Sequence, residues 1–278
     1  AGYVTLTLSA AGKAKLSGVL ANGTTWSSST PPGYQLADPE TGRPAVQVPV
    51  YVAKAKSAMG GWIKIADDPE SGLPVATGML DWYNADTNAT RGGVAGYALS
   101  LVATGGYYDT LFSLQTYYLN HDLTVGASAA PAAYDATYTE LLCAPETFGL
   151  ALTAVGDTLL AEKRALAKVP GTTLNDFENS VNPCNLTLSF KRPTGLFSGS
   201  FSLWYGNAAG TAQKEWTGVK VQGVLTPAKA SDSVYAGTPA LGFYLISEKI
   251  GARTWSGSYL FEIRAQEVIR DWSEGWDE

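Results

Sequence analysis

Nucleophilic catalysis of the serine-hydrolase type needs a histidine that takes the proton from the attacking hydroxyl. His121 is the only histidine of the chain, and it lies in the segment 117–122, Tyr-Tyr-Leu-Asn-His-Asp. The Gly-x-Ser-x-Gly motif, which marks the nucleophile in many such enzymes, does not occur in the sequence. We therefore expect a structural role for His121.

Hydrolysis of a glycoside needs two carboxyl groups, one acting as the acid and the other as the base or nucleophile. The chain has 25 Asp and Glu residues, and no spacing singles out one pair. The candidate acids are Asp67, Asp68, Glu70, Asp81, Asp109 and Asp135. Because none of them is marked, we predict no catalytic residue and rank a glycoside hydrolase behind the two binding functions discussed below.

The segment 67–72, Asp-Asp-Pro-Glu-Ser-Gly, offers oxygen atoms that calcium could use as ligands. Its spacing differs from that of an EF-hand loop, and Pro69 limits how the backbone can fold around an ion. A solvated turn is the simpler interpretation. The chain also lacks a phosphate-binding loop and a strand–Gly-x-Gly-x-x-Gly–helix unit, so we predict neither a metal ligand nor a cofactor.

Aromatic residues are the more promising candidates for binding, because the chain holds 8 Trp and 15 Tyr residues. Sugar rings present C–H faces that stack on exposed aromatic rings. The candidate glycan-binding residues are Trp82, Tyr83, Tyr107, Tyr108, Tyr117 and Tyr118. Neighbouring residues of a strand face opposite sides, so each tyrosine doublet is expected to direct one ring outward. The alternative is that most of these rings pack in the core or in cross-strand pairs.

The two cysteines, Cys143 and Cys184, have neither a Cys-x-x-Cys spacing nor a histidine nearby, which argues against a zinc site. The remaining alternatives are a disulfide and a pair of buried thiols. We predict a Cys143–Cys184 disulfide, because the composition is typical of extracellular proteins, in which disulfides persist.

The composition also limits the possible partners. The net charge is −6 and the 19 Lys and Arg residues are scattered, whereas nucleic-acid binding needs clustered basic residues. No segment approaches the ~20 apolar residues of a membrane span. Only 16% of the residues are charged, so Ser, Thr, Asn, Gly and Tyr must carry the surface, as in many extracellular β proteins. We expect a secreted or cell-surface location.

Short runs of alternating apolar and polar residues, broken by Gly, Asn and Pro, dominate the sequence. They predict strands near residues 3–8, 15–20, 46–52, 78–83, 97–102, 111–114, 186–190, 196–204, 216–225, 241–247 and 254–263, and a further strand that starts near residues 25–26. Residues 28–45 are expected to form a loop, and residues 123–138 an irregular segment. Pro49 cannot donate a ladder hydrogen bond, which indicates either an edge strand or an outward-facing nitrogen at that position.

Residues 157–168 fit a helix, because they include good helix formers, or the second half of a hairpin in which 150–154 pairs with 159–162. We predict the hairpin. The whole pattern predicts an all-β fold of antiparallel β-barrel or β-sandwich units with little helix. The expected organisation is a first β unit at 1–135, a connecting insert at 136–185 and a second β unit at 186–278, with one continuous domain as the alternative.

A short internal repeat supports two related halves. The tetrapeptide Leu-Thr-Leu-Ser occurs at 6–9 and again at 186–189, and a Ser-Gly pair follows each copy, at 17–18 and at 198–199. A duplication of the unit would explain this similarity, and so would the sequence pattern that β-hairpins have in common.

Several segments resemble a known group of sequences. They include GYVTLTLSAAGKAKLSGVLANGTTWSSS, VQVPVYVAKAKSAMGGWIKI, LTLSFKRPTGLFSGSFSLWY and GVKVQGVLTP. They resemble the C-terminal β-repeat regions of large secreted proteins of bacteria of the Verrucomicrobia, Kiritimatiellae and Lentisphaerae group. The resemblance covers residues 2–30, 46–83 and 186–263, and the segment 103–145 departs from it.

The resemblance implies a non-catalytic structural, assembly or adhesion module at the bacterial surface, with other copies or neighbouring domains as partners. It carries over no catalytic residue. The alternative function is a carbohydrate-binding module that uses exposed Tyr and Trp side chains.

Overall fold

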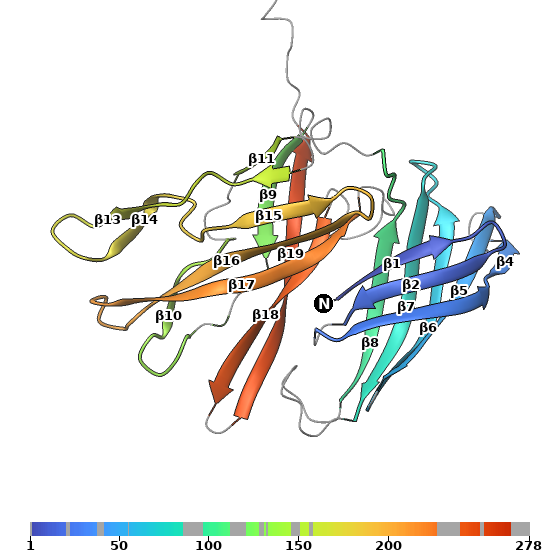
Figure 1. Ribbon diagram of the computed structural model, residues 1–278, viewed down its shortest axis with the longest axis horizontal. Helices are drawn as coiled ribbons and strands as arrows, with labels where there is room; N and C mark the ends of the chain where they lie inside the picture. The colour runs from blue at the N-terminus through green and yellow to red at the C-terminus, as the bar shows by residue number, and fades with distance from the viewer. Residues whose placement is uncertain are drawn as a thin grey trace, which may run out of the picture.

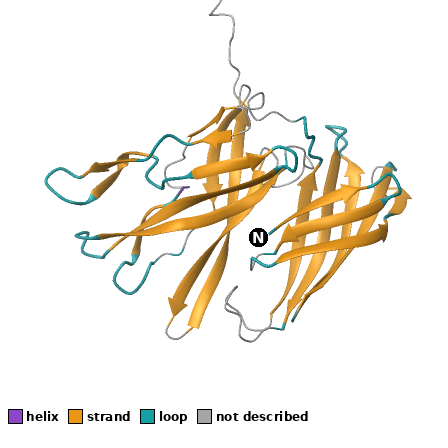
Figure 2. Ribbon diagram, in the orientation of Figure 1, coloured by secondary structure: helices purple, strands orange, loops and turns teal. Residues whose placement is uncertain are grey.

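The computed structural model describes residues 2–20, 23–37, 42–54, 56–85, 97–111, 121–127, 131, 133–145, 151–155, 158–226, 240–250 and 253–267. Strands dominate the described residues, and curled antiparallel sheets form a half-barrel, which confirms the predicted all-β class (Figures 1 and 2). No helix of the described residues is both long and apolar enough to cross a membrane.

The first half of the chain forms two sheets that pack against each other (Figure 1). The three-stranded sheet has the order β1(Tyr3–Leu8)-β2(Lys13–Val19)-β3(Thr25–Pro32). The five-stranded sheet has the order β4(Tyr34–Ala37)-β5(Pro44–Lys54)-β6(Ser57–Asp67)-β7(Pro74–Asn84)-β8(Tyr97–Gly106). Alternate side chains of both sheets meet in one core, which includes Leu16, Trp26, Val48, Ile63 and Trp82. The period-two alternation of the sequence thus forms this core.

The prediction of a loop over residues 28–45 is wrong for most of its length, because β3 and β4 occupy 25–32 and 34–37. Their Ser, Thr and Pro residues are poor strand signals, yet Ser28 Oγ donates a hydrogen bond to Tyr51 O of β5, 3.1 Å away. Pro49 does not lie in an edge strand, since β5 has β4 on one side and β6 on the other. The pairing with β4 ends at Tyr34 opposite Gln47, so Pro49 lies beyond the last ladder position on that side.

The second half is built on one nine-stranded sheet and a separate two-stranded ribbon. The path of the large sheet is β10(Glu140–Cys143)-β16(Leu196–Gly206)-β17(Gln213–Leu225)-β18(Ala240–Ile250)-β19(Arg253–Glu267)-β9(His121–Ala127)-β11(Ala151–Val155)-β12(Thr158–Leu160), and β15(Thr187–Lys191) pairs with β16. The ribbon consists of β13(Ala165–Lys168) and β14(Asn175–Val181). A second core, rich in Phe and Tyr, includes Phe197, Phe201, Tyr205, Tyr244 and Phe261.

Two predictions for the middle of the chain have different outcomes. The hairpin is confirmed, because β11 pairs with β12 with Val155 opposite Thr158. The irregular segment at 123–138 is wrong at its start, where β9 pairs with β19 over residues 121–127. β9 falls within the predicted first unit of 1–135, and its hydrogen bonds join it to the large sheet of the second half.

The two Ser-Gly pairs of the internal repeat lie in the second strands of two hairpins. A Cβ atom added to Gly18 would lie 2.2 Å from Tyr3 O, and one added to Gly199 would lie 2.0 Å from Thr187 O. Only glycine permits so close an approach of the neighbouring backbone. The registers of the hairpins differ, because Thr5 pairs with Ser17 whereas Thr187 pairs with Ser200.

The halves contact each other through the first strand. The ring centroid of Tyr3 lies 6.3 Å from that of Phe243 in β18. Phe243 is fully buried but is not a member of the second core. Burial raises the pKa of the Tyr3 hydroxyl above its ordinary value of 10.0, because the phenolate would lose hydration at this contact.

Candidate functional site

The side of the β4–β8 sheet that faces away from the core is the most distinctive surface of the described residues. The register places five sets of residues on it: even positions 34–36, odd positions 45–53, even positions 58–66, odd positions 75–83 and even positions 98–106. We call these positions the outer face. An antiparallel sheet with one solvated side normally carries polar residues at such positions, and this sheet carries large apolar residues among them.

Seven large apolar side chains of the outer face are exposed to solvent. They are Tyr34 (59% exposed), Leu36 (43%), Tyr51 (69%), Trp62 (46%), Met79 (64%), Tyr83 (57%) and Val102 (80%). Pro49, Trp62, Met79 and Val102 are directly opposite one another on four consecutive strands, and we call them the central row. Single exposed apolar residues are ordinary, whereas a contiguous set across five strands marks an interaction surface.

Small residues separate the large ones on the outer face. Ala53, Ala58, Ala66 and Ala98 occupy outward positions on strands β5, β6 and β8, and Ala45 occupies an outward position that is buried. Gly60 pairs with Tyr51, and a Cβ atom added to this glycine would lie 3.9 Å from the Tyr51 ring. The tyrosine ring therefore leans over the glycine.

Two rings of the outer face meet across an intervening strand. Tyr34 of β4 and Trp62 of β6 have ring centroids 5.8 Å apart with planes inclined at 57°. Strands β4 and β6 lie on opposite sides of β5, and strands two apart are separated by roughly 10 Å. Both rings therefore lean toward each other over β5, and they form one continuous aromatic surface.

Charge is nearly absent from the outer face. Its outward positions contain one basic residue, Lys64, and one acidic residue, Asp81. Asp81 Oδ1 accepts a hydrogen bond from Ser100 Oγ of the neighbouring strand, 2.7 Å away. Lys64 and Asp81 lie on opposite sides of the central row, so the face carries a balanced pair of charges around an apolar middle.

The predicted glycan-binding residues have different positions in the structure. Trp82 is only 2% exposed, and its Nε1 donates to Ser57 Oγ at 2.7 Å, so it is a core residue and offers no ring to a ligand. Its neighbour Tyr83 lies on the outer face, as alternation along a strand requires. Tyr107, which follows β8, is 52% exposed.

Tyr108 is half-buried, and its hydroxyl donates to Arg192 O at 2.6 Å. Its ring lies against Gly195 in the turn before β16. This side chain therefore links the segment after β8 to the second core. Tyr117 and Tyr118 lie outside the described residues. The structure thus brings one predicted residue, Tyr83, together with Tyr34, Tyr51 and Trp62, which the sequence interpretation missed.

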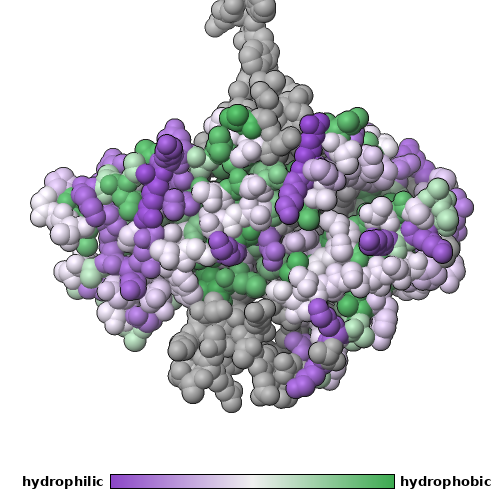
Figure 3. Space-filling model, in the orientation of Figure 1, coloured by the Kyte–Doolittle hydropathy of each residue, from purple (hydrophilic) through white to green (hydrophobic). Residues whose placement is uncertain are grey.

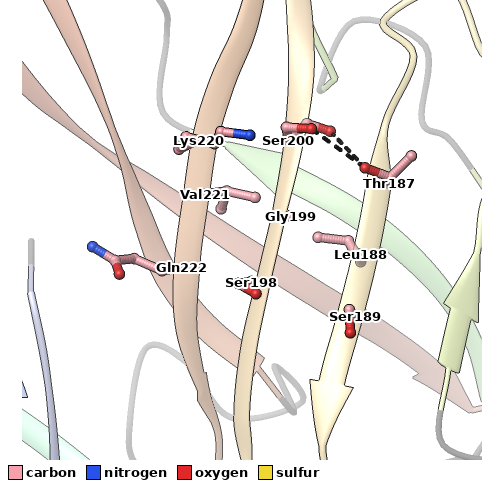
Figure 4. Close-up of a pocket in the computed structure, with 9 residues that line it drawn as sticks. All are labelled: Thr187, Leu188, Ser189, Ser198, Gly199, Ser200, Lys220, Val221 and Gln222. Carbon is pink, nitrogen blue, oxygen red and sulfur yellow. Dashed lines mark hydrogen bonds between the residues drawn. The ribbon is translucent and has the colours of Figure 1, made fainter.

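A second surface is a shallow, open groove of about 460 Å³ on β15, β16 and β17 (Figure 4). Its outward side chains are short and polar or carry a single charge: Thr187, Ser189, Ser198, Ser200, Lys220 and Gln222. Thr187 and Ser200 face each other with their hydroxyl oxygens 3.4 Å apart. No aromatic residue lines the groove. In Figure 3, strongly hydrophilic side chains are likewise scattered among pale ones over both halves of the visible side.

Cys143 and Cys184 are adjacent and fully buried, with their Sγ atoms 2.8 Å apart. Cys143 ends β10, and Cys184 lies in the turn before β15. The buried Asn182 holds this turn, since its Oδ1 accepts Leu186 N at 2.9 Å and its Nδ2 donates to Glu162 O at 2.8 Å. Both cysteines are free thiols in this structure, so the disulfide itself stays a prediction.

Three of the acids weighed for catalysis or calcium binding, Asp68, Asp109 and Asp135, accept hydrogen bonds within local turns. Asp68 is buried, and its Oδ2 accepts hydrogen bonds from Ser71 N and Ser71 Oγ, both at 2.9 Å. Asp109 and Asp135 each accept the backbone N–H of the second residue that follows. His121 begins β9 opposite Glu267, and its side chain lies outside the described part. Within the described ranges, no group of three or more His, Cys, Asp or Glu residues could hold a metal ion.

The outer face and the groove are therefore the two surfaces from which a function can be argued. Comparison with protein-family models, with curated proteins and with solved structures found no match for the chain.

Proposed function

We propose that the chain is a non-catalytic structural module of a secreted or cell-surface bacterial protein, used for assembly or adhesion, and that it attaches through the outer face of the β4–β8 sheet. The observation that carries this proposal is the exposed central row with the tyrosines around it. A contiguous apolar face of this kind is typical of interaction surfaces. The low share of charged residues and the resemblance to secreted β-repeat regions support the location.

The attachment can be tested with purified protein. Retention is measured on immobilised copies of the same chain and on insoluble cellulose, chitin and peptidoglycan. We expect Met79→Lys, which places a charge in the central row, to abolish retention, because a lysine buried at an interface loses its hydration without gaining a partner.

A matched control is Val155→Lys in β11, since Val155 is 58% exposed and belongs to the nine-stranded sheet rather than to the β4–β8 sheet. It should bind like the unmodified chain. Retention that is equal for both variants would refute the outer face as the attachment surface. Turnover of a glycan that a single Asp or Glu substitution abolishes would refute the non-catalytic role.

The second candidate function is carbohydrate binding, and the observation that favours it is the aromatic surface of Tyr34 and Trp62 beside the Asp81–Ser100 pair. Rings would stack on the C–H faces of a sugar while the polar pair exchanges hydrogen bonds with its hydroxyls. Trp62→Ala should then remove polysaccharide retention while the chain remains monomeric at every concentration.

A further inference from the structure

The outer face has the size of a stable protein interface. The strands β5, β6 and β7 each have 11 residues and β8 has 10. With ~3.4 Å per residue and ~4.8 Å per strand, the four strands β5–β8 cover roughly 19 by 34 Å, or about 650 Å². Two such faces in contact would bury about 1,300 Å², which lies within the range of specific protein–protein interfaces.

The composition of the central row favours a protein partner over a sugar. Met79 and Val102 are among the most exposed apolar residues of the face, at 64% and 80%. Aliphatic side chains offer a glycan no stacking surface and no hydrogen bond, whereas the sheet-on-sheet packing of proteins relies on them. Aromatic residues and methionine are also enriched in the centres of protein interfaces, where charged residues are depleted.

The two charges of the face are arranged so that each would lie over the opposite charge of a copy of the same face. Lys64 follows Trp62 by two residues in β6, and Asp81 follows Met79 by two residues in β7. Because the strands are antiparallel, the two charges lie on opposite sides of the central row. A two-fold axis in the plane of contact, passing between Trp62 and Met79, would bring each Lys64 over the Asp81 of the other copy. A two-fold interface is self-complementary in this sense: if residue i of one copy contacts residue j of the other, then residue j of the first copy contacts residue i of the second.

From these three observations we infer that a second copy of this chain covers the outer face in a face-to-face, two-fold dimer. The inference rests on the proposed function, of which it names the partner. It assigns the central row to the middle of the interface and the Lys64–Asp81 pairs to its two ends.

The test measures the mass of the full chain by sedimentation and by light scattering over a wide range of protein concentrations. We expect a dimer for the unmodified chain and for Val155→Lys, and a monomer for Val102→Lys. Lys64→Asp should weaken association by about tenfold or more, because like charges then face each other across the interface. Lys64→Asp combined with Asp81→Lys should restore the affinity to within about threefold, since the charges are again complementary.

A circular dichroism spectrum and a thermal unfolding curve for each variant show whether it folds. A folded chain that is monomeric throughout, yet loses polysaccharide retention with Trp62→Ala, overturns the second copy as partner and leaves the attachment face in place. A dimer that Val102→Lys and the charge exchange do not affect overturns the inference as well. If outer-face variants alter neither self-association nor retention on any surface, the proposed function fails with it.

Discussion

The outer faces of two sheets in the same chain have opposite chemistry. On β4–β8 the outward positions hold Tyr, Trp, Met and Val beside alanines, whereas on β15–β17 they hold Ser, Thr, Gln and one Lys. The inward positions of both sheets are apolar. Burial of the inner side is what makes each sheet fold, so only the outer side is free to differ. The comparison teaches that the apolar outer face of β4–β8 is not required by the fold.

The largest expected effect separates the two sides of β4–β8 with two tryptophans. Trp82→Ala should lower the free energy of unfolding by about 3–5 kcal/mol, because it leaves a cavity in the core. Trp62→Ala should change it by less than ~1 kcal/mol, since Trp62 lies on the solvent side. Urea unfolding followed by fluorescence measures both. Equal losses for the two variants would contradict the assignment of sides.

The next effect concerns the second half alone. Oxidation of the Cys143 and Cys184 thiols, with two electrons and two protons passing to a disulfide such as oxidised glutathione, should form one intramolecular bond. The bond would close a loop between Cys143 and Cys184, which are 41 positions apart. Closing such a loop should stabilise the chain by roughly 3–4 kcal/mol in the chain-entropy model. Mass spectrometry after alkylation under unfolding conditions counts the free thiols. Two alkylated cysteines after oxidation would exclude the bond, and Cys143→Ser is the control.

A smaller effect on stability concerns the close approach of β15 and β16, the strands that line the groove. Gly199→Ala should destabilise the chain by about 1–3 kcal/mol, because its Cβ atom would lie 2.0 Å from Thr187 O and the two strands must separate. Gly60→Ala is the control on the other sheet, since its nearest neighbour is 3.7 Å away. Thermal unfolding of the two variants compares them. A Gly199→Ala chain as stable as Gly60→Ala would show that the close approach is not rigid.

The smallest effect is a pH dependence at the contact between the halves. The pKa of Tyr3 is raised by burial, so the folded state favours the neutral phenol. The contribution of this group is complete below the ordinary pKa of 10.0 and is lost as the pH rises through the folded-state value. The unfolding temperature should therefore fall more steeply above pH ~10 for the unmodified chain than for Tyr3→Phe. Identical slopes would argue against a buried Tyr3 hydroxyl.

Much of the fold could be predicted from the sequence, because alternation and turn residues act locally. The strands β5, β7 and β15–β19 lie close to their predicted positions. The start of β3 near residue 25 was predicted but not its extent to Pro32, and β4 and β9 were missed. The physical reason is that their Ser-, Pro- and Ala-containing segments have weak strand preference, and long-range pairing decides their conformation. The partners that stabilise β9 come from β19 and β11, far away in the sequence.

The candidate site was harder to predict than the fold. Aromatic doublets indicated exposed rings, yet Trp82 is in the core and Tyr108 is half-buried. The side of a sheet to which a residue belongs follows from the register, and a shift of one residue inverts it. The signal that could have found Trp62 and Met79 is alternation along the strand. Trp62 lies directly before the buried Ile63, and Met79 directly before the buried Leu80. Tyr34 could not have been found this way, because its strand was expected to be a loop.

The order of strands in the large sheet also determines when each half can fold during synthesis. The sheets β1–β8 use only strands that follow one another closely, so they can assemble as soon as residue 106 has left the ribosome. β9 must wait for β19, which pairs with it from the far end of the described chain. Until then the edge of β9 that pairs with β19 has no partner strand, and such edges attract other chains. The second half is therefore the part of this protein that depends most on rapid completion of its chain, or on a chaperone that shields it.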